Sequence, residues 1–129
     1  RMKRGMKIMK KKALVVDNTS YIRADIRELL EEQGYEVYEA GDGLEAFEIY
    51  KKIKPDIVTM DINMPKVHGL KATQLITDFD PKARVMICST MITFQNYIKM
   101  AKEAGAKSFL SKPFSDEEFF DELAKLFLV

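Results

Sequence analysis

Three apolar runs of the sequence end in side chains that could together form one polar site. Asp17 and Asn18 follow Leu14-Val15-Val16, Asp61 follows Ile57-Val58-Thr59-Met60, and Ser111 and Lys112 follow Phe109-Leu110. If the runs are strands of one parallel sheet, their carboxyl ends meet at one edge, which is where open α/β proteins place their chemistry. Two carboxylates, an amide and a lysine at such an edge suit a divalent cation and an anion.

The elements that would position these side chains follow from hydrophobic patterning. Five apolar, β-branched runs predict strands at residues 13–17, 36–40, 56–61, 84–88 and 107–111. Runs such as Val85-Met86-Ile87 are apolar on both faces, as is typical of strands in a covered parallel sheet. Since amphipathic stretches alternate with the runs, we expect an α/β fold, a (βα)5 doubly wound parallel five-stranded sheet.

Helices are predicted between the strands from apolar spacing and end signals. The first helix has Ser20 as its expected N-cap and Gly34 as its stop, and the last follows three acidic residues that favour a helix N-terminus. The second helix is expected to close at Pro55 and the fourth at Gly105. The apolar stripes are Ile22, Ile26, Leu29 and Leu30 in the first helix, and Phe119, Leu123, Leu126 and Phe127 in the last.

Length and composition indicate one ordinary domain without internal disulfide bonds. At 129 residues, the chain is long enough to bury about two-thirds of its unfolded surface. Its one cysteine, Cys88, excludes an internal disulfide and fits a reducing compartment. No apolar stretch approaches the roughly 20 residues of a membrane span, and no signal peptide is visible, so we expect a cytoplasmic protein without a membrane partner.

The net charge of +1 conceals a basic segment at the start of the chain. Residues 1–12 carry seven Lys or Arg and no acid, whereas the rest carries fourteen basic and twenty acidic residues. A basic arm at residues 1–11 could bind nucleic acid or an anionic membrane, but we expect a disordered, solvated leader or a remnant of expression. The acidic body, residues 12–129, argues against nucleic-acid binding by the domain itself.

Five ordered motifs resemble the receiver domain of two-component response regulators, a CheY-like flavodoxin fold, over residues 12–129. Within this family, the sequence most resembles the single-domain chemotaxis members. The resemblance implies the strand order 2-1-3-4-5. The motifs are Val15-Val16-Asp17-Asn18, Met60-Asp61-Ile62-Asn63-Met64-Pro65, Cys88-Ser89-Thr90, Ala104-Gly105-Ala106 and Lys112-Pro113-Phe114.

The resemblance implies a role for each matching residue. Asp61 would be the phosphoacceptor, and Mg²⁺ would be held by Asp17, Asn18, Asp61 and the backbone carbonyl of Asn63. Lys112 and Ser89 would contact the phosphoryl group, Phe109 would be the aromatic switch, and the bond before Pro113 is commonly cis in the family. The protein would be a signalling phosphoprotein rather than an enzyme.

Partners are also implied by the resemblance. A sensor histidine kinase would donate the phosphoryl group. The output would be an unknown protein, or an output domain after Val129, contacted through Tyr97, Met100 and Phe109. On the fourth helix, Phe94, Ile98 and Ala101 are expected to be buried, with Tyr97, Met100 and Ala104 off that stripe.

Three positions depart from the family pattern. Asn18 replaces a carboxylate ligand, which removes one negative charge from the metal site and should weaken Mg²⁺ binding. His68 replaces an acidic residue, either as a solvated loop residue or as a pH-sensitive contact. Thr90 stands where a small residue usually follows the switch hydroxyl, and it could crowd the loop or point to solvent.

Other functions remain open from the sequence. A pseudo-receiver would keep the fold as a docking module with a weakened metal site. A haloacid-dehalogenase-type, Mg²⁺-dependent phosphatase would use Asp17 as nucleophile, but Thr19 stands where that class has a second acid. A flavodoxin would need a phosphate-cradling loop after the first strand, which the sequence lacks.

Overall fold

The computed structural model of the chain describes residues 10–128. The basic arm predicted at residues 1–11 lies almost entirely outside this range. The strands are β1 (Lys12–Val16), β2 (Glu36–Ala40), β3 (Ile57–Met60), β4 (Val85–Ser89) and β5 (Ser108–Ser111). The helices are α1 (Ser20–Glu32), α2 (Gly43–Ile53), α3 (Gly69–Phe79), the 3-10 helix η1 (Thr90–Thr93), α4 (Gln95–Ala104) and α5 (Asp116–Lys125).

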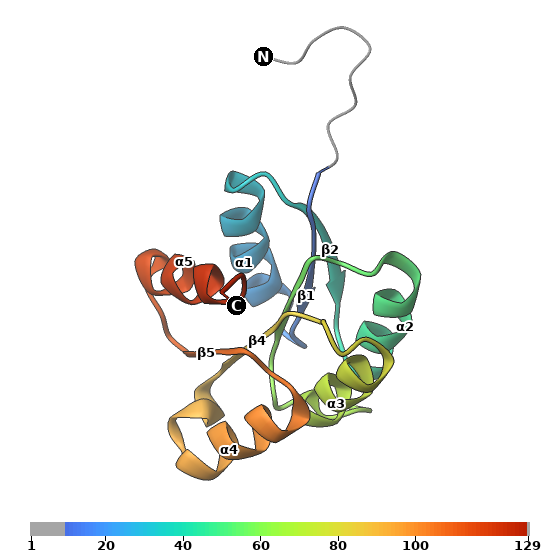
Figure 1. Cartoon of the computed structure of the whole chain (residues 1–129). Helices are drawn as coiled ribbons and strands as arrows, with labels where there is room; N and C mark the ends of the chain where they lie inside the picture. The colour runs from blue at the N-terminus through green and yellow to red at the C-terminus, as the bar shows by residue number, and fades with distance from the viewer. Residues whose placement is uncertain (1–9, 129) are drawn as a thin grey trace, which may run out of the picture.

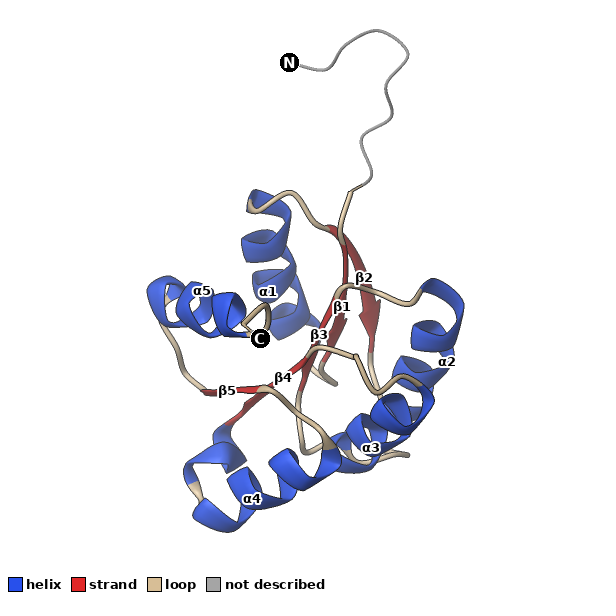
Figure 2. Ribbon diagram, in the orientation of Figure 1, coloured by secondary structure: helices blue, strands red, loops and turns tan. Residues whose placement is uncertain are grey.

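The strands form one parallel sheet in the order β2-β1-β3-β4-β5, as predicted. Helices α1 and α5 cover one face and α2, α3 and α4 cover the other (Figures 1 and 2). Alternate strand residues feed two cores, because successive side chains point to opposite faces. Leu14 and Val16 join the core under α2, α3 and α4, whereas Ala13 and Val15 join the core under α1 and α5.

The register of the sheet brings three strand ends to one edge. Val16 pairs with Met60, Met60 with Ile87, and Ser89 with Ser111, so the residues that follow β1, β3 and β5 emerge at the same edge of the sheet. Most strand ends lie one residue away from their predicted positions. Asp17 and Asp61 therefore lie just beyond their strands, in the loops that form the site.

The ends of the helices confirm most of the expected signals. Gly34 and Gly105 have positive φ angles of 88° and 105°, the left-handed conformation that commonly follows a helix. Ser20, however, is the first residue of α1; Thr19 is the N-cap and its side chain makes no capping hydrogen bond. Helix α5 begins with a capping box, in which Ser115 and Glu118 each accept a hydrogen bond from the other's backbone.

The predicted face of the fourth helix is partly wrong. Phe94 precedes α4 and is 57% exposed, although the spacing predicted burial, while Ala104 is buried although it was placed off the stripe. The reason is the 3-10 helix at Thr90–Thr93, whose different rotation per residue breaks continuity with α4. Ala101 is buried and Met100 is exposed, as predicted.

Phe127 also departs from its predicted place on a buried stripe. It follows the end of α5 and is 37% exposed. Its ring lies under the Lys11 ammonium, 4.4 Å from the centroid, and near the Arg84 guanidinium at 4.9 Å. A cation–π contact at the start of the sheet therefore replaces the expected core contact. Within residues 10–128, no helix has the length and apolar character needed to cross a membrane.

Candidate functional site

Lys112 joins two buried carboxylates at the carboxyl edge of the sheet. Its Nζ lies 2.5 Å from Asp17 Oδ2 and 3.6 Å from Asp61 Oδ1. Asp17 is 1% exposed and Asp61 is 8% exposed, although each follows the end of a strand. Buried charges of this kind are costly unless they are paired, so the single Lys112 ammonium offsets part of the cost of burying the two acids.

The carboxyl group of Asp61 is held in a partly desolvated environment. Burial raises its pKa, the Lys112 ammonium opposes that rise, and the Asp17 carboxylate adds to it. The backbone N–H of Ile62 donates to Asp61 Oδ1 at 2.9 Å, and this bond and the Ser89 hydroxyl lower the pKa. The Ile62 N–H and Lys112 Nζ thus both approach the same oxygen of the carboxylate, Oδ1.

Asp17 and Asn18 lie in the loop between β1 and α1. The backbone N–H of Thr19 donates to Asp17 Oδ1 at 2.9 Å, and the Asp17 N–H donates to the Ala40 carbonyl at 3.1 Å. Asn18 is exposed beside this anchored carboxylate. The Asp17 carboxylate is thus held in place, whereas the neighbouring Asn18 side chain is accessible from solvent.

The oxygen atoms gathered at this edge fit Mg²⁺. Asp17 and Asp61 offer carboxylates, Asn18 offers an amide oxygen, and Asn63 lies on the exposed loop after Asp61. Mg²⁺ prefers such hard oxygen ligands and keeps several waters, so two carboxylates are enough. Among residues 10–128, no group of three or more His, Cys, Asp or Glu side chains could hold a metal.

The loop from Asp61 to α3 is folded tightly against the end of that helix. The Gly69 N–H donates to the Ile62 carbonyl at 2.8 Å, and a Cβ at Gly69 would lie only 1.8 Å from the Asp61 carbonyl oxygen. His68 is the N-cap of α3, and its Nδ1 accepts a hydrogen bond from Leu70 N–H at 3.3 Å. The histidine therefore caps a helix here, a local role that the sequence did not suggest.

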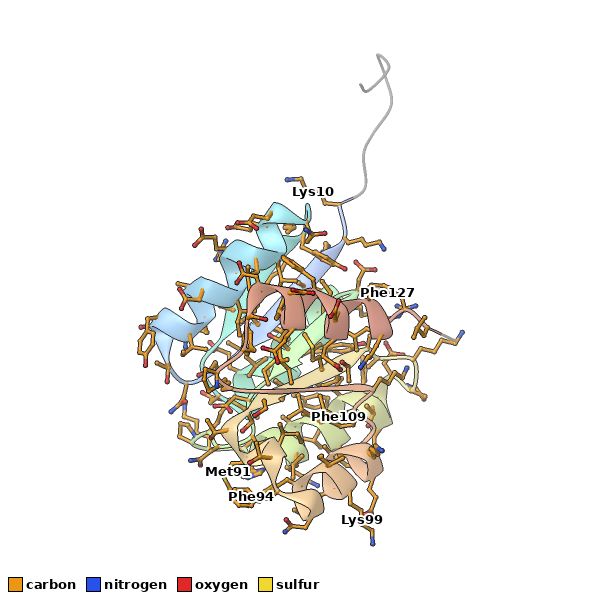
Figure 3. The ribbon with its side chains drawn as sticks, turned by 90° about the vertical axis from the view of Figure 1, so that its left-hand side faces the viewer. Lys10, Met91, Phe94, Lys99, Phe109 and Phe127 are labelled. Carbon is orange, nitrogen blue, oxygen red and sulfur yellow. The ribbon has the colours of Figure 1, made fainter. Side chains whose placement is uncertain are left out.

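Ser89 and Phe109 lie on the neighbouring strands β4 and β5. The Ser89 hydroxyl is buried and accepts a hydrogen bond from Met91 N–H at 3.1 Å, so it also caps η1. The Phe109 ring is half-buried against the core, with Lys102 Nζ at 5.8 Å from its centroid. Figure 3 shows Phe109 above the segment that carries Met91 and Phe94. Thr90 is exposed, and the Lys112–Pro113 bond is cis.

An ion-pair network behind Asp17 was not anticipated from the sequence. Arg23 on α1 donates to the Asp17 carbonyl and to Glu39 on β2, and Arg27 holds the other oxygen of Glu39. Residues 23 and 27 lie one turn apart on a helix, which was the available signal. Their partner could be identified only once the placement of β2 beside β1 was known.

Comparisons with known proteins agree with this architecture. The family model described as the response regulator receiver domain matches residues 13–124. Protein CcdB of Bacillus subtilis is 44% identical over 116 residues, which cover 89% of this chain and 96% of that protein. Chemotaxis protein CheY of Thermotoga maritima is 42% identical over 119 residues, covering 92% and 98%.

Solved structures give the same result. The crystal structure of the CheX–CheY–BeF3–Mg²⁺ complex from Borrelia burgdorferi matches with a TM-score of 0.87 and 30% identity. The match covers 92% of this chain and 90% of that chain.

Proposed function

Because the chain belongs to the response regulator receiver family, we propose that Asp61 accepts a phosphoryl group and that this modification switches the surface around Phe109. The observation that carries the proposal is the Asp61 carboxylate beside Lys112 and Asp17 at the edge of the sheet. Receiver domains act in phosphorylation-dependent signalling. The proposed donor of the phosphoryl group is a phosphohistidine of a sensor kinase. The proposed receiver domain comprises residues 12–129.

The chemistry is a displacement at phosphorus. An oxygen of the Asp61 carboxylate forms a bond to phosphorus while the bond from phosphorus to the histidine nitrogen of the donor breaks. The acyl phosphate is later hydrolysed by water, which restores the carboxylate and releases inorganic phosphate. Because the reaction needs an ionised nucleophile, the Lys112 ammonium assists by holding the Asp61 pKa below the value that burial alone would impose.

Electrostatic stabilisation of the transferred group is the second requirement. Lys112 can turn from Asp17 toward the phosphoryl oxygens, and the Ser89 hydroxyl can donate to them. Asp17, Asn18, Asp61 and the Asn63 carbonyl are the proposed holders of Mg²⁺. When bound, the cation would neutralise negative charge on the moving group. Receiver domains generally bind Mg²⁺, and the Borrelia burgdorferi relative was crystallised with BeF3 and Mg²⁺, which supports the proposal.

The switch would pass from Ser89 to Phe109. Movement of the Ser89 hydroxyl toward the phosphoryl group would release its hydrogen bond from Met91 N–H, which holds η1. The half-buried Phe109 ring could then turn inward, and the surface of Tyr97, Met100 and Phe109 would change for an output partner. Shifting such an equilibrium from 1% to 99% takes about 5.5 kcal/mol, the scale of a few charge-assisted hydrogen bonds.

The direct test is phosphorylation by acetyl phosphate with and without Mg²⁺, followed by intact mass. The expected result is a gain of one phosphoryl group that requires Mg²⁺. A pseudo-receiver is the second candidate, favoured by Asn18, whose side chain is an amide where the family has a carboxylate ligand. A folded protein that stays unmodified at saturating Mg²⁺ would support the pseudo-receiver and contradict the phosphoacceptor.

Asn18→Asp is expected to bind Mg²⁺ roughly ten- to thirtyfold more tightly than the wild type. The substitution returns one negative charge to the metal site, with a net gain of about 1–2 kcal/mol after desolvation. Titration of Mg²⁺ followed by NMR measures the affinity of both proteins. Asn96→Asp adds the same charge to an exposed position of α4 and is the matched control. Equal affinities of wild type and Asn18→Asp would show that the Asn18 side chain does not contact the metal.

Lys112→Ala is expected to need a roughly ten- to hundredfold higher concentration of beryllofluoride than the wild type to give the same response. A hydrogen bond to a charged group contributes about 1.5–3 kcal/mol, and the mutant loses the only ammonium beside Asp61 among the described residues. The measurement is the chemical-shift change near Phe109 as beryllofluoride is added with Mg²⁺. Lys107→Ala removes an exposed lysine before β5 and should respond like the wild type. A normal response in Lys112→Ala would refute the role of the lysine.

A further inference from the structure

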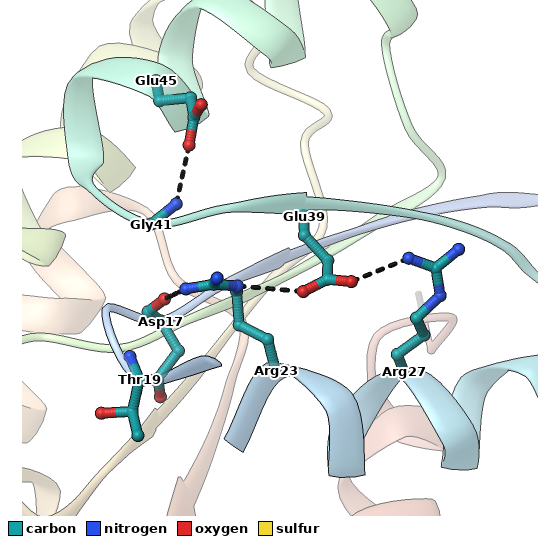
Figure 4. Close-up of polar contacts among 7 residues, drawn as sticks. All are labelled: Asp17, Thr19, Arg23, Arg27, Glu39, Gly41 and Glu45. Atoms are coloured by element: carbon teal, nitrogen blue, oxygen red, sulfur yellow. Dashed lines mark hydrogen bonds and ion pairs between the residues drawn. The ribbon is translucent and has the colours of Figure 1, made fainter. Parts of the chain in front are cut away.

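A chain of ion pairs ties α1 to β2 directly behind Asp17 (Figure 4). Arg23 Nη1 donates to the main-chain carbonyl of Asp17 at 2.6 Å, and Arg23 Nε donates to Glu39 Oε1 at 2.9 Å. Arg27 Nη1 donates to the other oxygen of Glu39 at 2.7 Å. One guanidinium therefore bridges the loop that carries Asp17 and a neighbouring strand of the sheet.

The geometry of this bridge is restrictive. A guanidinium is a rigid planar fork, so fixing Nε on Glu39 also fixes where Nη1 meets the Asp17 carbonyl. The Arg23 side chain is 20% exposed and that of Glu39 is 30% exposed, so both are largely shielded from water. Lys at this position would keep the charge but could not reproduce the two-pronged contact.

The anchor on β2 is itself held in place. Glu39 pairs in register with Val15 of β1, two residues before Asp17. The hydrogen bond from Arg27 is the main cause that lowers the Glu39 pKa, and Arg23 lowers it further, so the carboxylate remains ionised. The network thus connects the loop to the rigid part of the sheet.

We propose that Arg23, anchored by Glu39, is a positioning residue for the metal-binding part of the site. It holds the main-chain carbonyl of Asp17, which lies between the Asp17 carboxylate and the next residue, Asn18. Removing the bridge frees the loop, and the two ligands no longer lie ready for the cation. The inference deepens the proposed function and rests on it, since it concerns affinity for Mg²⁺ at the same site.

Positioning and simple electrostatics predict opposite results for one substitution. Arg23→Gln removes a positive charge that repels the cation, so electrostatics alone would strengthen Mg²⁺ binding. If Arg23 positions Asp17, the same substitution weakens Mg²⁺ binding instead. Loss of a contact that orients a metal ligand typically costs ten- to a hundredfold in affinity, and we expect about tenfold here.

Arg27→Gln is the matched control. It removes the same charge, one helical turn away, and the same kind of bond to Glu39, but Arg27 does not contact Asp17 in the described structure. The experiment titrates Mg²⁺ alone into the 129-residue wild type, Arg23→Gln, Arg23→Lys and Arg27→Gln. Backbone amide shifts of Asn18 and Thr19 report binding, and circular dichroism confirms folding.

The expected result is about tenfold weaker Mg²⁺ binding in Arg23→Gln and clearly weaker binding in Arg23→Lys, with a change of less than about twofold in Arg27→Gln. Equal or tighter binding by folded Arg23→Gln would overturn the positioning role while leaving the proposed function intact. Equal weakening in Arg27→Gln would also overturn it, because the effect would belong to the whole network. A wild type that does not bind Mg²⁺ would overturn both this inference and the proposed function.

Discussion

Asp61→Asn is expected to remain unmodified by acetyl phosphate and Mg²⁺, while the wild type gains one phosphoryl group. An amide cannot act as the nucleophile that the carboxylate oxygen provides, so the loss should be complete rather than partial. Intact mass after incubation measures the result. Asp78→Asn makes the same replacement on the exposed surface of α3 and should be phosphorylated normally. Modification that persists in Asp61→Asn would refute the assignment.

The same variant is expected to keep or increase its stability at neutral pH. Burial and the neighbouring Asp17 raise the pKa of the Asp61 carboxyl group above its value in the unfolded chain. A raised pKa means that ionised Asp61 disfavours folding; this penalty begins to fall as the pH drops through the folded-state pKa and is gone below the unfolded-state pKa. Asparagine removes the penalty at every pH.

Urea unfolding at two pH values tests the direction of this effect on stability. The free energy of unfolding of Asp61→Asn should be at least that of the wild type at pH 7, and the difference should narrow in acid. A mutant that is less stable than the wild type at pH 7 would show that the carboxylate contributes to stability through its contact with Lys112.

Gly69→Ala is expected to have the largest effect on stability of any single methyl added to the site. The new Cβ would lie 1.8 Å from the Asp61 carbonyl oxygen and 2.8 Å from Ile62 Cα, both main-chain atoms. Since no side chain can turn away to make room, the loop after Asp61 must move. Overpacking costs about 1–3 kcal/mol and occasionally more, and we expect at least about 3 kcal/mol with slow phosphorylation.

Urea unfolding and the rate of phosphorylation measure this effect, with Gly41→Ala as the control. A Cβ at Gly41 meets only the Arg23 side chain, at an ordinary 3.5 Å. The control should lose less than about 1 kcal/mol, as is usual for a tolerated surface substitution. Gly69→Ala with near-wild-type stability and rate would mean that the loop after Asp61 relaxes freely.

The fold and the core of the site follow from local sequence patterns. A strand that is apolar on both faces must lie inside a parallel sheet, and a polar residue directly after it must emerge at the carboxyl edge. For this reason Asp17, Asp61 and Lys112 could be brought together from the sequence without knowledge of any contact. The roles assigned to them remain predictions.

Other features depended on geometry that spacing does not encode. Phe94 was predicted to be buried because a single helix was assumed there, and the 3-10 helix before α4 changed the direction of its side chain. The pair of Arg23 and Glu39 spans 16 residues and two elements. Such a contact depends on how far α1 lies from β2, which is set by packing rather than by the local sequence.

Cys88 gives the protein a practical property that concerns how the proposed switch could be observed. The side chain is 1% exposed near the carboxyl end of β4, and burial raises the pKa of its thiol to about 12. Since the thiolate is the species that reacts with alkylating labels, the native residue is inert toward them at neutral pH. It is also the only cysteine in the sequence. A cysteine introduced at exposed Met100 would therefore be the only residue to react with a fluorophore or spin label. The surface near Phe109 could then be monitored in real time in a protein that is otherwise unchanged.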